Sequence, residues 1–236
     1  LLLVCNAGEE GLGNLKGVHK ICEDFGDRIE RFCTFDSSLS SIVDRAVGSK
    51  RFRVRVRTRG GHSYDDFGND NAIAGLASLV GKLYGIRVPE GGKTTYNVGM
   101  ISGGTSVNTI AQEAEMLYEF RSDRRENLEY MERQFMEVFD RAKAEGMDVS
   151  FKVIGVRPCE GQVDPKRKQA LSDWAHRVVE EMTGQAPKHC AGSTDCNIPL
   201  SLGIPSVCVG SFRGAGAHTR EEYVETDSLE EGYKVA

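Results

Sequence analysis

Apolar residues recur along this chain with two different periods, and these periods predict where its strands and helices lie. Residues 1–5 form an uninterrupted apolar run, which is typical of a buried strand in a parallel sheet. A helical pattern over about 14–24 and a second strand over about 31–35 follow it. Because strand, helix and strand succeed one another, residues 1–48 predict part of an α/β domain.

The pattern changes at Gly48-Ser49. Basic and apolar residues alternate over 51–57, which predicts a strand with one buried and one solvated face. A polyanion site is the alternative interpretation of its four arginines. Further along, we expect a helix over 71–84, strands over 94–100 and 114–121, a helix over 126–146 and a strand over 149–156. The order β-α-β-β-α-β predicts an inserted ferredoxin-like domain over residues 49–157.

The α/β pattern returns over residues 158–236. A helix is expected over 166–183, ended by Gly184, and a strand over 206–209. A glycine-rich loop over 210–219 contains His218. The predicted fold is an α/β domain with a parallel-rich sheet, interrupted by the ferredoxin-like insertion. Because the chain opens inside an expected core strand, we interpret it as the C-terminal part of a longer protein.

Composition narrows the functional classes. The 236 residues carry a net charge of −5, which gives no electrostatic reason to expect nucleic acid as a partner. No apolar run approaches the roughly 20 residues that span a bilayer. The seven cysteines include no CxxC pair, and this usage favours reduced thiols and a cytoplasmic location.

The candidate catalytic and metal-binding residues lie where the predicted α/β elements end. Glu9 and Glu10 follow the first expected strand, Asp36 follows the second, and His218 ends the glycine-rich loop. Ligands bind at the carboxyl ends of strands in open α/β sheets, and carboxylates with imidazole suit zinc or a similar divalent ion. The alternatives are an acidic helix N-terminus for the glutamates, a turn for Asp36 and a surface loop for His218.

Six short motifs together resemble the di-zinc peptidase and deacylase family, which includes aminoacylase, acetylornithine deacetylase, succinyl-diaminopimelate desuccinylase, glutamate carboxypeptidase and peptidase T. The motifs occur in the family's order along the whole chain. They are Gly8-Glu9-Glu10-Gly11, Asp36, Gly60-Gly61-His62-Ser63 with Asn71-Ala72-Ile73, the segment 104–121, Gly192-Ser193-Thr194-Asp195 with Gly203-Ile204-Pro205, and the segment 214–223.

The resemblance implies roles for residues of the α/β part. Glu9 is expected to be the general base, taking a proton from a metal-bridging water and passing it to the leaving amine. Glu10 and His218 are expected to ligate one of two metal ions, most simply zinc, and Asp36 the other. Asp195 is expected to act through its loop rather than as a ligand.

For the inserted domain, the resemblance implies a lid that also forms a homodimer. His62 is expected to reach across the dimer interface and to polarise the scissile carbonyl or hold the oxyanion. Asn108 and Arg121 are expected to orient the substrate, with Arg121 contacting a carboxylate. A turn residue and a solvated strand-end charge are the alternatives for these two positions.

The chain lacks the family's His-x-Asp motif and bridging Asp, so its expected ligand set is incomplete. We therefore expect these 236 residues alone to bind metal poorly and to hydrolyse nothing, and the full-length protein to do both. In the family, Asp at position 36 accompanies peptidases of small peptides, so we predict an aminopeptidase or a di- or tripeptidase. The alternatives are an N-acyl amino acid deacylase and a non-catalytic dimerisation or binding module.

Overall fold

The computed structural model describes residues 1–217 and 219–236, and in it the chain divides into two compact units. Unit 1 consists of Leu1–Gly48 and Arg157–Ala236, and unit 2 of Ser49–Val156. Unit 1 is therefore built from two segments that are distant in the sequence, and unit 2 is the intervening segment.

Unit 1 contains a four-stranded mixed sheet. Its strands, in spatial order, are β1 (Phe32–Phe35), β10 (Ser206–Val209), β2 (Ser41–Ala46) and β9 (Lys188–Gly192). The pairs β1–β10 and β2–β9 are parallel, whereas β10–β2 is antiparallel. Each parallel pair joins one strand from the first segment of unit 1 to one from the second, so the sheet holds the two segments together.

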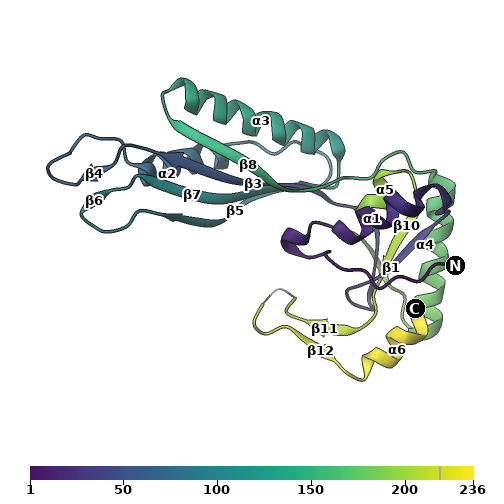
Figure 1. Cartoon of the computed structure of the whole chain (residues 1–236). Helices are drawn as coiled ribbons and strands as arrows, with labels where there is room; N and C mark the ends of the chain where they lie inside the picture. Colours follow the sequence, from purple (N-terminus) through teal and green to yellow (C-terminus); the bar gives the residue numbers. More distant parts are fainter. Residues whose placement is uncertain (218) are drawn as a thin grey trace. The chain divides into compact units, whose positions relative to one another are not determined.

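Helices cover both faces of this sheet (Figure 1). On one face, α4 (Pro165–Thr183) and α6 (Ser228–Val235) bury residues such as Leu171 and Val235 against Ile42 and Val207. On the other face, α5 (Asn197–Ser201) packs against the sheet, and α1 (Lys16–Phe25) packs against α5. The remaining elements are η1 (Gly11–Gly13), η2 (Gly26–Arg28), and the hairpin of β11 (Arg213–Ala215) with β12 (Tyr223–Glu225).

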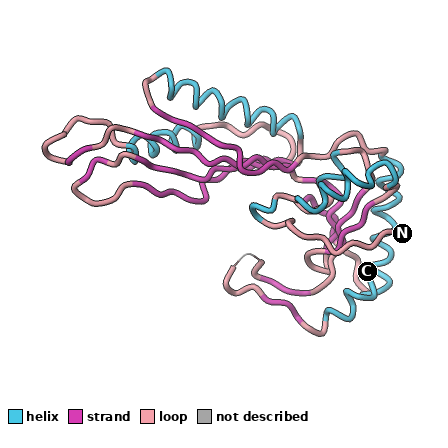
Figure 2. The backbone as a smooth tube through the Cα atoms, in the orientation of Figure 1, coloured by secondary structure: helices cyan, strands magenta, loops and turns pink. Residues whose placement is uncertain are grey.

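Unit 2 has the predicted ferredoxin-like order of elements. Along the chain these are β3 (Gly48–Arg57), α2 (Ala72–Tyr84), β5 (Thr94–Gly103), β7 (Glu113–Ser122), α3 (Arg125–Ala144) and β8 (Asp148–Arg157), and the spatial order of the strands is β5-β7-β3-β8. A short ribbon of β4 (Gly61–His62) and β6 (Thr109–Ile110) forms the tip of the unit (Figure 2).

The core of unit 2 is a cluster of aromatic rings between the sheet and the helices. The ring of Phe135 on α3 stacks on Phe52 at a centroid distance of 4.1 Å and on Tyr118 at 5.7 Å. Leu76, Leu79 and their neighbours on α2 close the same core. The alternation predicted for β3 is confirmed, because Phe52, Val54 and Val56 are buried there.

The structure corrects the prediction of a buried strand at the start of the chain. Residues 1–9 form no strand, and Leu1, Leu2, Leu3 and Val4 are exposed. An apolar run forms a strand only where the backbone of another strand is available for hydrogen bonding, and no described strand pairs with this segment. The loop predicted over 210–219 also differs, because residues 213–215 form β11.

The buried stripe of α4 differs from the predicted one. The helical spacing of the apolar residues Leu171, Trp174, Val178 and Met182 predicts that these four face inward, but Trp174 and Met182 are each 45% exposed. Leu171, Ser172, Ala175 and Val179 face the sheet instead. Ser172 and Ala175 are small, which lets α4 lie close to the strands. The close packing gained in this way outweighs the burial of the large side chains of Trp174 and Met182.

Candidate active site

Glu9 is held by a buried arginine. It lies just before η1, and Arg157 lies at the end of β8. Arg157 donates from Nη1 to Glu9 Oε1 at 2.8 Å and from Nη2 to the Glu9 carbonyl oxygen at 2.6 Å. Nη1 also contacts Ser193 Oγ at 3.2 Å. The Glu9 carboxylate is therefore fixed through one oxygen, and no described side chain donates a hydrogen bond to its other oxygen, Oε2.

Two further carboxylates act on the pKa of Glu9. Burial raises the pKa of Glu9, the Arg157 charge opposes that rise, and the charges of Glu10 and Asp195 add to it. The sequence segments at positions 9 and 195 therefore meet in unit 1, within the range of electrostatic interaction.

Asp195 is one of the carboxylates near Glu9, and its burial was not predicted from the sequence. It lies in the turn between β9 and α5 and is 7% exposed. Its Oδ2 accepts a hydrogen bond from Asn6 Nδ2 at 2.5 Å, and its Oδ1 is buried without a partner among the described residues. Burial raises the pKa of Asp195, and the Asp36 charge raises it further. The signal in the sequence was the motif Gly192-Ser193-Thr194-Asp195, in which an acidic residue follows a run of small ones.

Asp36 lies directly after β1, at the predicted end of the strand. Its N–H donates to the Val209 carbonyl at 3.0 Å, and its Oδ1 accepts from the Ser37 N–H at 2.7 Å. Ser37 adopts a φ of +75°, which turns the chain sharply behind the carboxylate. Asp36 is exposed, but its charge acts on the pKa of Asp195.

The described residues do not by themselves form the predicted metal centre. Glu10 is exposed, and the backbone at this position opens η1. His218 lies outside the described residues. Among residues 1–217 and 219–236, no group of three His, Cys, Asp or Glu side chains is placed to hold a metal ion. Glu10 and Asp36 alone fall short of the roughly three protein ligands of a catalytic zinc site.

In unit 2, the tip brings His62 and Asn108 together. The Ser63 N–H donates to the Asn108 carbonyl at 3.0 Å, and His62 pairs with Thr109 across β4 and β6. His62 Nδ1 lies 3.2 Å from Asp65 Oδ2. The segments that carry two of the three predicted unit 2 residues therefore meet, although they are distant in the sequence.

Arg121 is not part of this tip. It lies near the end of β7, eight residues after Glu113, or about 26 Å along an extended strand. Its guanidinium contacts Glu119 rather than His62 or Asn108. Within unit 2, the three predicted residues therefore occupy two separate places.

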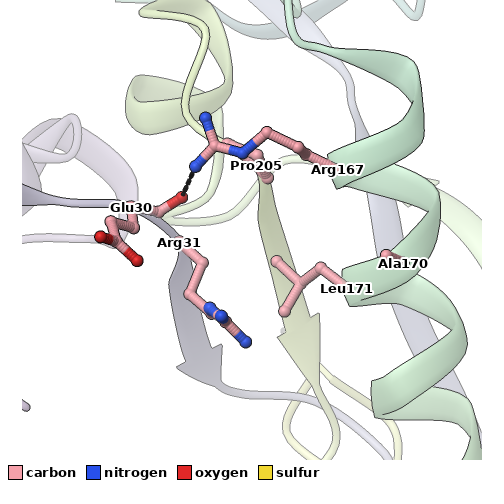
Figure 3. A pocket seen from close by; sticks show the side chains of 6 residues that line it. All are labelled: Glu30, Arg31, Arg167, Ala170, Leu171 and Pro205. Carbon is pink, nitrogen blue, oxygen red and sulfur yellow. Dashed lines mark hydrogen bonds between the residues drawn. The ribbon is translucent and has the colours of Figure 1, made fainter.

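A separate cavity of about 240 Å³ lies beside the start of β1 (Figure 3). It is lined by Glu30, Arg31, Arg167, Ala170, Leu171 and Pro205. Arg167 Nη2 donates to the Glu30 carbonyl at 2.7 Å. None of the predicted site residues lines it, so this concavity of unit 1 is not the candidate site.

Comparison with known proteins supports the predicted resemblance. Residues 46–147 match the family model of the peptidase dimerisation domain of the M20 type. Over 119 residues, the chain is 35% identical to a p-aminobenzoyl-glutamate hydrolase homolog of Haemophilus influenzae. That alignment covers 50% of this chain and 26% of the relative.

Solved structures share the fold of nearly the whole chain. The aminopeptidase PepT of Bacillus cereus matches with a TM-score of 0.71 and 23% identity, over 98% of this chain and 61% of its own. A tripeptidase of Staphylococcus aureus matches with a TM-score of 0.70 and 20% identity, over 94% and 59%. An aminobenzoyl-glutamate utilization protein of Klebsiella pneumoniae matches with a TM-score of 0.68 and 16% identity, over 98% and 58%.

This chain therefore spans about three fifths of the length of those structures and about a quarter of the curated relative. No described helix is long and apolar enough to cross a membrane. Residues 46–147 therefore match the peptidase dimerisation domain, and nearly the whole chain shares its fold with the solved aminopeptidase and tripeptidase structures.

Proposed function

We propose that this chain is part of a metal-dependent hydrolase that cleaves an amide bond in small peptides, as an aminopeptidase or a di- or tripeptidase. The observation that carries the proposal is the convergence of Glu9, Asp36 and Asp195 in one region of unit 1, where Glu9 is ion-paired with the buried Arg157, Asp195 is buried, and Asp195 interacts electrostatically with the other two. Three carboxylates from distant segments are costly to bring together, and such clusters are typical of hydrolytic sites. The fold shared with an aminopeptidase and a tripeptidase supports the choice of substrate.

Glu9 acts as the general base in this proposal. Arg157 holds Oε1 at 2.8 Å and so fixes the direction of the carboxylate, which leaves Oε2 to accept a proton from the attacking water. The same oxygen then delivers that proton to the nitrogen of the leaving amine. The carboxylate is regenerated when the amine departs, so one residue serves both halves of the reaction.

We further propose two divalent metal ions, most simply zinc. Glu10 and His218 would hold one ion and Asp36 the other. The described residues form no complete ligand set, so further ligands would be needed beside these three. The chain by itself should accordingly bind zinc weakly and lack activity.

Unit 2 serves as lid and dimerisation surface in the proposal. His62 polarises the scissile carbonyl in the site of the partner, while Asn108 and Arg121 orient the substrate. The strand β5 supports a homodimer, because it lies at an edge of the sheet and exposes Met100 and Ile101. Sedimentation of the chain tests the dimer, and a monomer at micromolar concentration would contradict it.

A deacylase of N-acyl amino acids is the second candidate, supported by the identity with the p-aminobenzoyl-glutamate hydrolase homolog. Like a peptidase, such an enzyme cleaves an amide, and only the acyl side differs. The third candidate is a dimerisation or binding module without catalysis. It predicts a stable dimer and no metal-dependent turnover in any form of the protein.

One experiment separates the three candidates. A longer form of the protein that includes the segment before Leu1 is assayed with zinc on di- and tripeptides and on N-acyl amino acids, beside the 236-residue chain. We expect turnover of peptides by the longer form only, and a Glu9→Gln variant slower by about 10²–10⁴-fold. Glu23→Gln, an exposed glutamate of α1, is the matched control. Tight zinc binding by the short chain, or full activity of E9Q, would overturn the proposal.

We also propose that the protein resides in the cytoplasm. None of the seven cysteines, all of which lie in the described part of the chain, forms a disulfide, and all but Cys5 are buried or half-buried. Labelling of thiols in cells before and after fractionation tests this location. Recovery of the protein with oxidised cysteines from an extracellular fraction would contradict it.

A further inference from the structure

Two histidines that the proposed function does not use lie between α4 and the sheet of unit 1. His176 is in the second half of α4, and His189 is near the start of β9. His176 Nδ1 lies 2.9 Å from His189 Nε2, which is a hydrogen-bond distance. The ring centroids are 5.1 Å apart, and the ring planes differ by 9°. Because the two nitrogens are much closer together than the ring centres, the imidazoles meet edge to edge.

A carboxylate fixes the proton of His189 from the other side of its ring. Asp44 Oδ2 lies 2.7 Å from His189 Nδ1, and it also accepts a hydrogen bond from Ser172 Oγ at 3.0 Å. An ionised carboxylate only accepts hydrogen bonds, so His189 Nδ1 carries a hydrogen. In the neutral ring, His189 Nε2 then has a lone pair, and His176 Nδ1 must be the donor to it.

Local geometry in the strands and in α4 brings these side chains together. The register between β2 and β9 shifts at Asp44, which has no partner there. His189 lies directly opposite Ile42, so Asp44 lies diagonally across from it, within reach of an imidazole. On α4, Ser172 and His176 are four residues apart and therefore lie on the same side of the helix.

Both rings are accessible to protons, and one further carboxylate lies near them. The side chains of His176 and His189 are 31% and 34% exposed. Glu180 Oε2 lies 3.9 Å from His176 Nε2, one turn further along α4. The charged groups on α6, which packs against α4, are engaged in other ion pairs. The neighbouring charged groups on β2, β9 and α4 are the exposed side chains of Arg45, Lys188, Asp173 and Arg177.

The number of bound protons decides whether the two rings can stay bonded. When both rings are neutral, His176 Nδ1–H donates to His189 Nε2, and His176 Nε2 has a lone pair. One added proton binds to His176 Nε2, faces Glu180 and leaves the bond between the rings intact. A second added proton has to bind to His189 Nε2, which then meets the N–H of His176 at a distance that suits one hydrogen. Two N–H groups repel each other, so the bond between the rings breaks.

We propose that His176 and His189 form an acid-sensitive latch between α4 and β9. The latch keeps its hydrogen bonds with no added proton or with one, and it opens with two. Histidine is the side chain that changes its charge between about pH 5 and 8, and the second proton binds at the acid end of this range. Because β9 leads into the turn with Ser193 and Asp195, the latch lies on the strand that ends at the candidate site.

The first test compares unfolding of the 236-residue chain at pH 7 and at pH 4.5, in EDTA so that metal ions do not bind the imidazoles. His176→Asn keeps an amide donor in place of Nδ1 but takes up no proton. His19→Asn, at an exposed histidine of α1 in the same unit, is the matched control. Trp174 fluorescence during urea unfolding reports the equilibrium constant of each protein.

The unfolded wild-type chain binds two protons at these histidines where the closed latch binds one, so acid favours unfolding. On going from pH 7 to pH 4.5, we expect the unfolding constant of the wild type and of H19N to rise about tenfold more than that of H176N, because one hydrogen bond is lost. The same rise in all three proteins would overturn the inference.

A second measurement does not depend on the folding of a variant. The N–H proton between the two rings is followed by NMR in the wild-type chain labelled with ¹⁵N-histidine. We expect its resonance at pH 7 and at pH 6, and its loss at pH 4.5 while the backbone resonances of unit 1 remain those of the folded state. Absence of the resonance at pH 7, its persistence at pH 4.5, or its loss only together with the folded state would contradict the latch.

Discussion

The two units of the chain differ in where their charged residues lie and in how these are paired. On the open face of unit 2, arginines of β3 pair with glutamates of β7, and each of Glu113, Glu115 and Glu119 has an arginine partner. In unit 1, Arg157 and Asp195 are buried and Glu9 is half-buried. The two buried carboxylate oxygens without a hydrogen-bond partner in the described structure, on Asp44 and Asp195, both belong to unit 1.

This contrast distinguishes a scaffold from a site. Exposed ion pairs cost little to form and contribute little to stability. Buried, incompletely paired carboxylates are expensive, and they persist where they serve binding or chemistry. The contrast can be measured because the fluorescence of the single tryptophan, Trp174 on α4, reports on unit 1.

The largest effect is expected in the core of unit 2. Phe135→Ala removes a fully buried ring that stacks on Phe52 and Tyr118, and it should lower the free energy of unfolding of unit 2 by about 3–5 kcal/mol. Circular dichroism during urea unfolding measures the loss. Met136→Ala, at the partly exposed next position, is the control. A loss of the same size in the Trp174 transition would show that the units unfold together.

The next effect is expected at the buried ion pair of unit 1. Arg157→Met leaves Glu9 without its partner and should destabilise unit 1 by about 3 kcal/mol. The Trp174 transition in urea should move, while Arg167→Met, at an exposed arginine of α4, should leave it in place. The double variant R157M/E9Q should recover part of the loss. No recovery would mean that Arg157 acts through Ser193 and packing alone.

A smaller effect is expected at a side-chain network between α4 and the sheet of unit 1. His189 Nδ1 lies 2.7 Å from Asp44 Oδ2, and Ser172 Oγ donates to the same oxygen at 3.0 Å. His189→Ala should cost about 1–3 kcal/mol, because Asp44 would lose its strongest partner. The midpoint of thermal unfolding measures this change. An unchanged midpoint would show that water replaces the imidazole.

The smallest effects should have opposite signs in the two units. The pKa of Glu119 is lowered, so its ionised form stabilises unit 2 above pH 4.5, and this stabilisation is lost as the pH falls through the lowered pKa. The pKa of Asp195 is raised, so its ionisation costs stability as the pH rises above 3.8. At pH 7, Glu119→Gln should destabilise unit 2 by about 1 kcal/mol.

By the same argument, Asp195→Asn should stabilise unit 1 at pH 7. Both differences should disappear in strongly acidic solution, where each carboxyl is protonated in the folded and unfolded states. Urea unfolding at pH 7 and at successively lower pH measures how each difference shrinks. Destabilisation by D195N at pH 7 would show that its bond to Asn6 outweighs the cost of burying the charge.

Periodicity in the sequence was sufficient to predict most elements of unit 2 and their order. Residues that make contact between a strand and the next helix are close in the sequence. The buried stripe of Met131, Phe135 and Phe139 on α3 lies where its helical period predicts. Likewise, Asp36 lies directly after β1 because a strand ends where its apolar run ends. Local pattern therefore determined most of the elements, the ferredoxin-like arrangement and the position of Asp36 at a strand end.

Only the tertiary structure decided which residues are buried together. The burial of Asp195, the ion pair of Arg157 with Glu9 and the ion pair of Arg51 with Glu119 depend on pairings between strands or segments, and periodicity does not encode these pairings. For the same reason the apolar residues 1–4 remained exposed, since no described strand offers them a backbone partner. A sequence specifies what each residue prefers to contact, but the contact itself depends on which other segments the fold brings within reach.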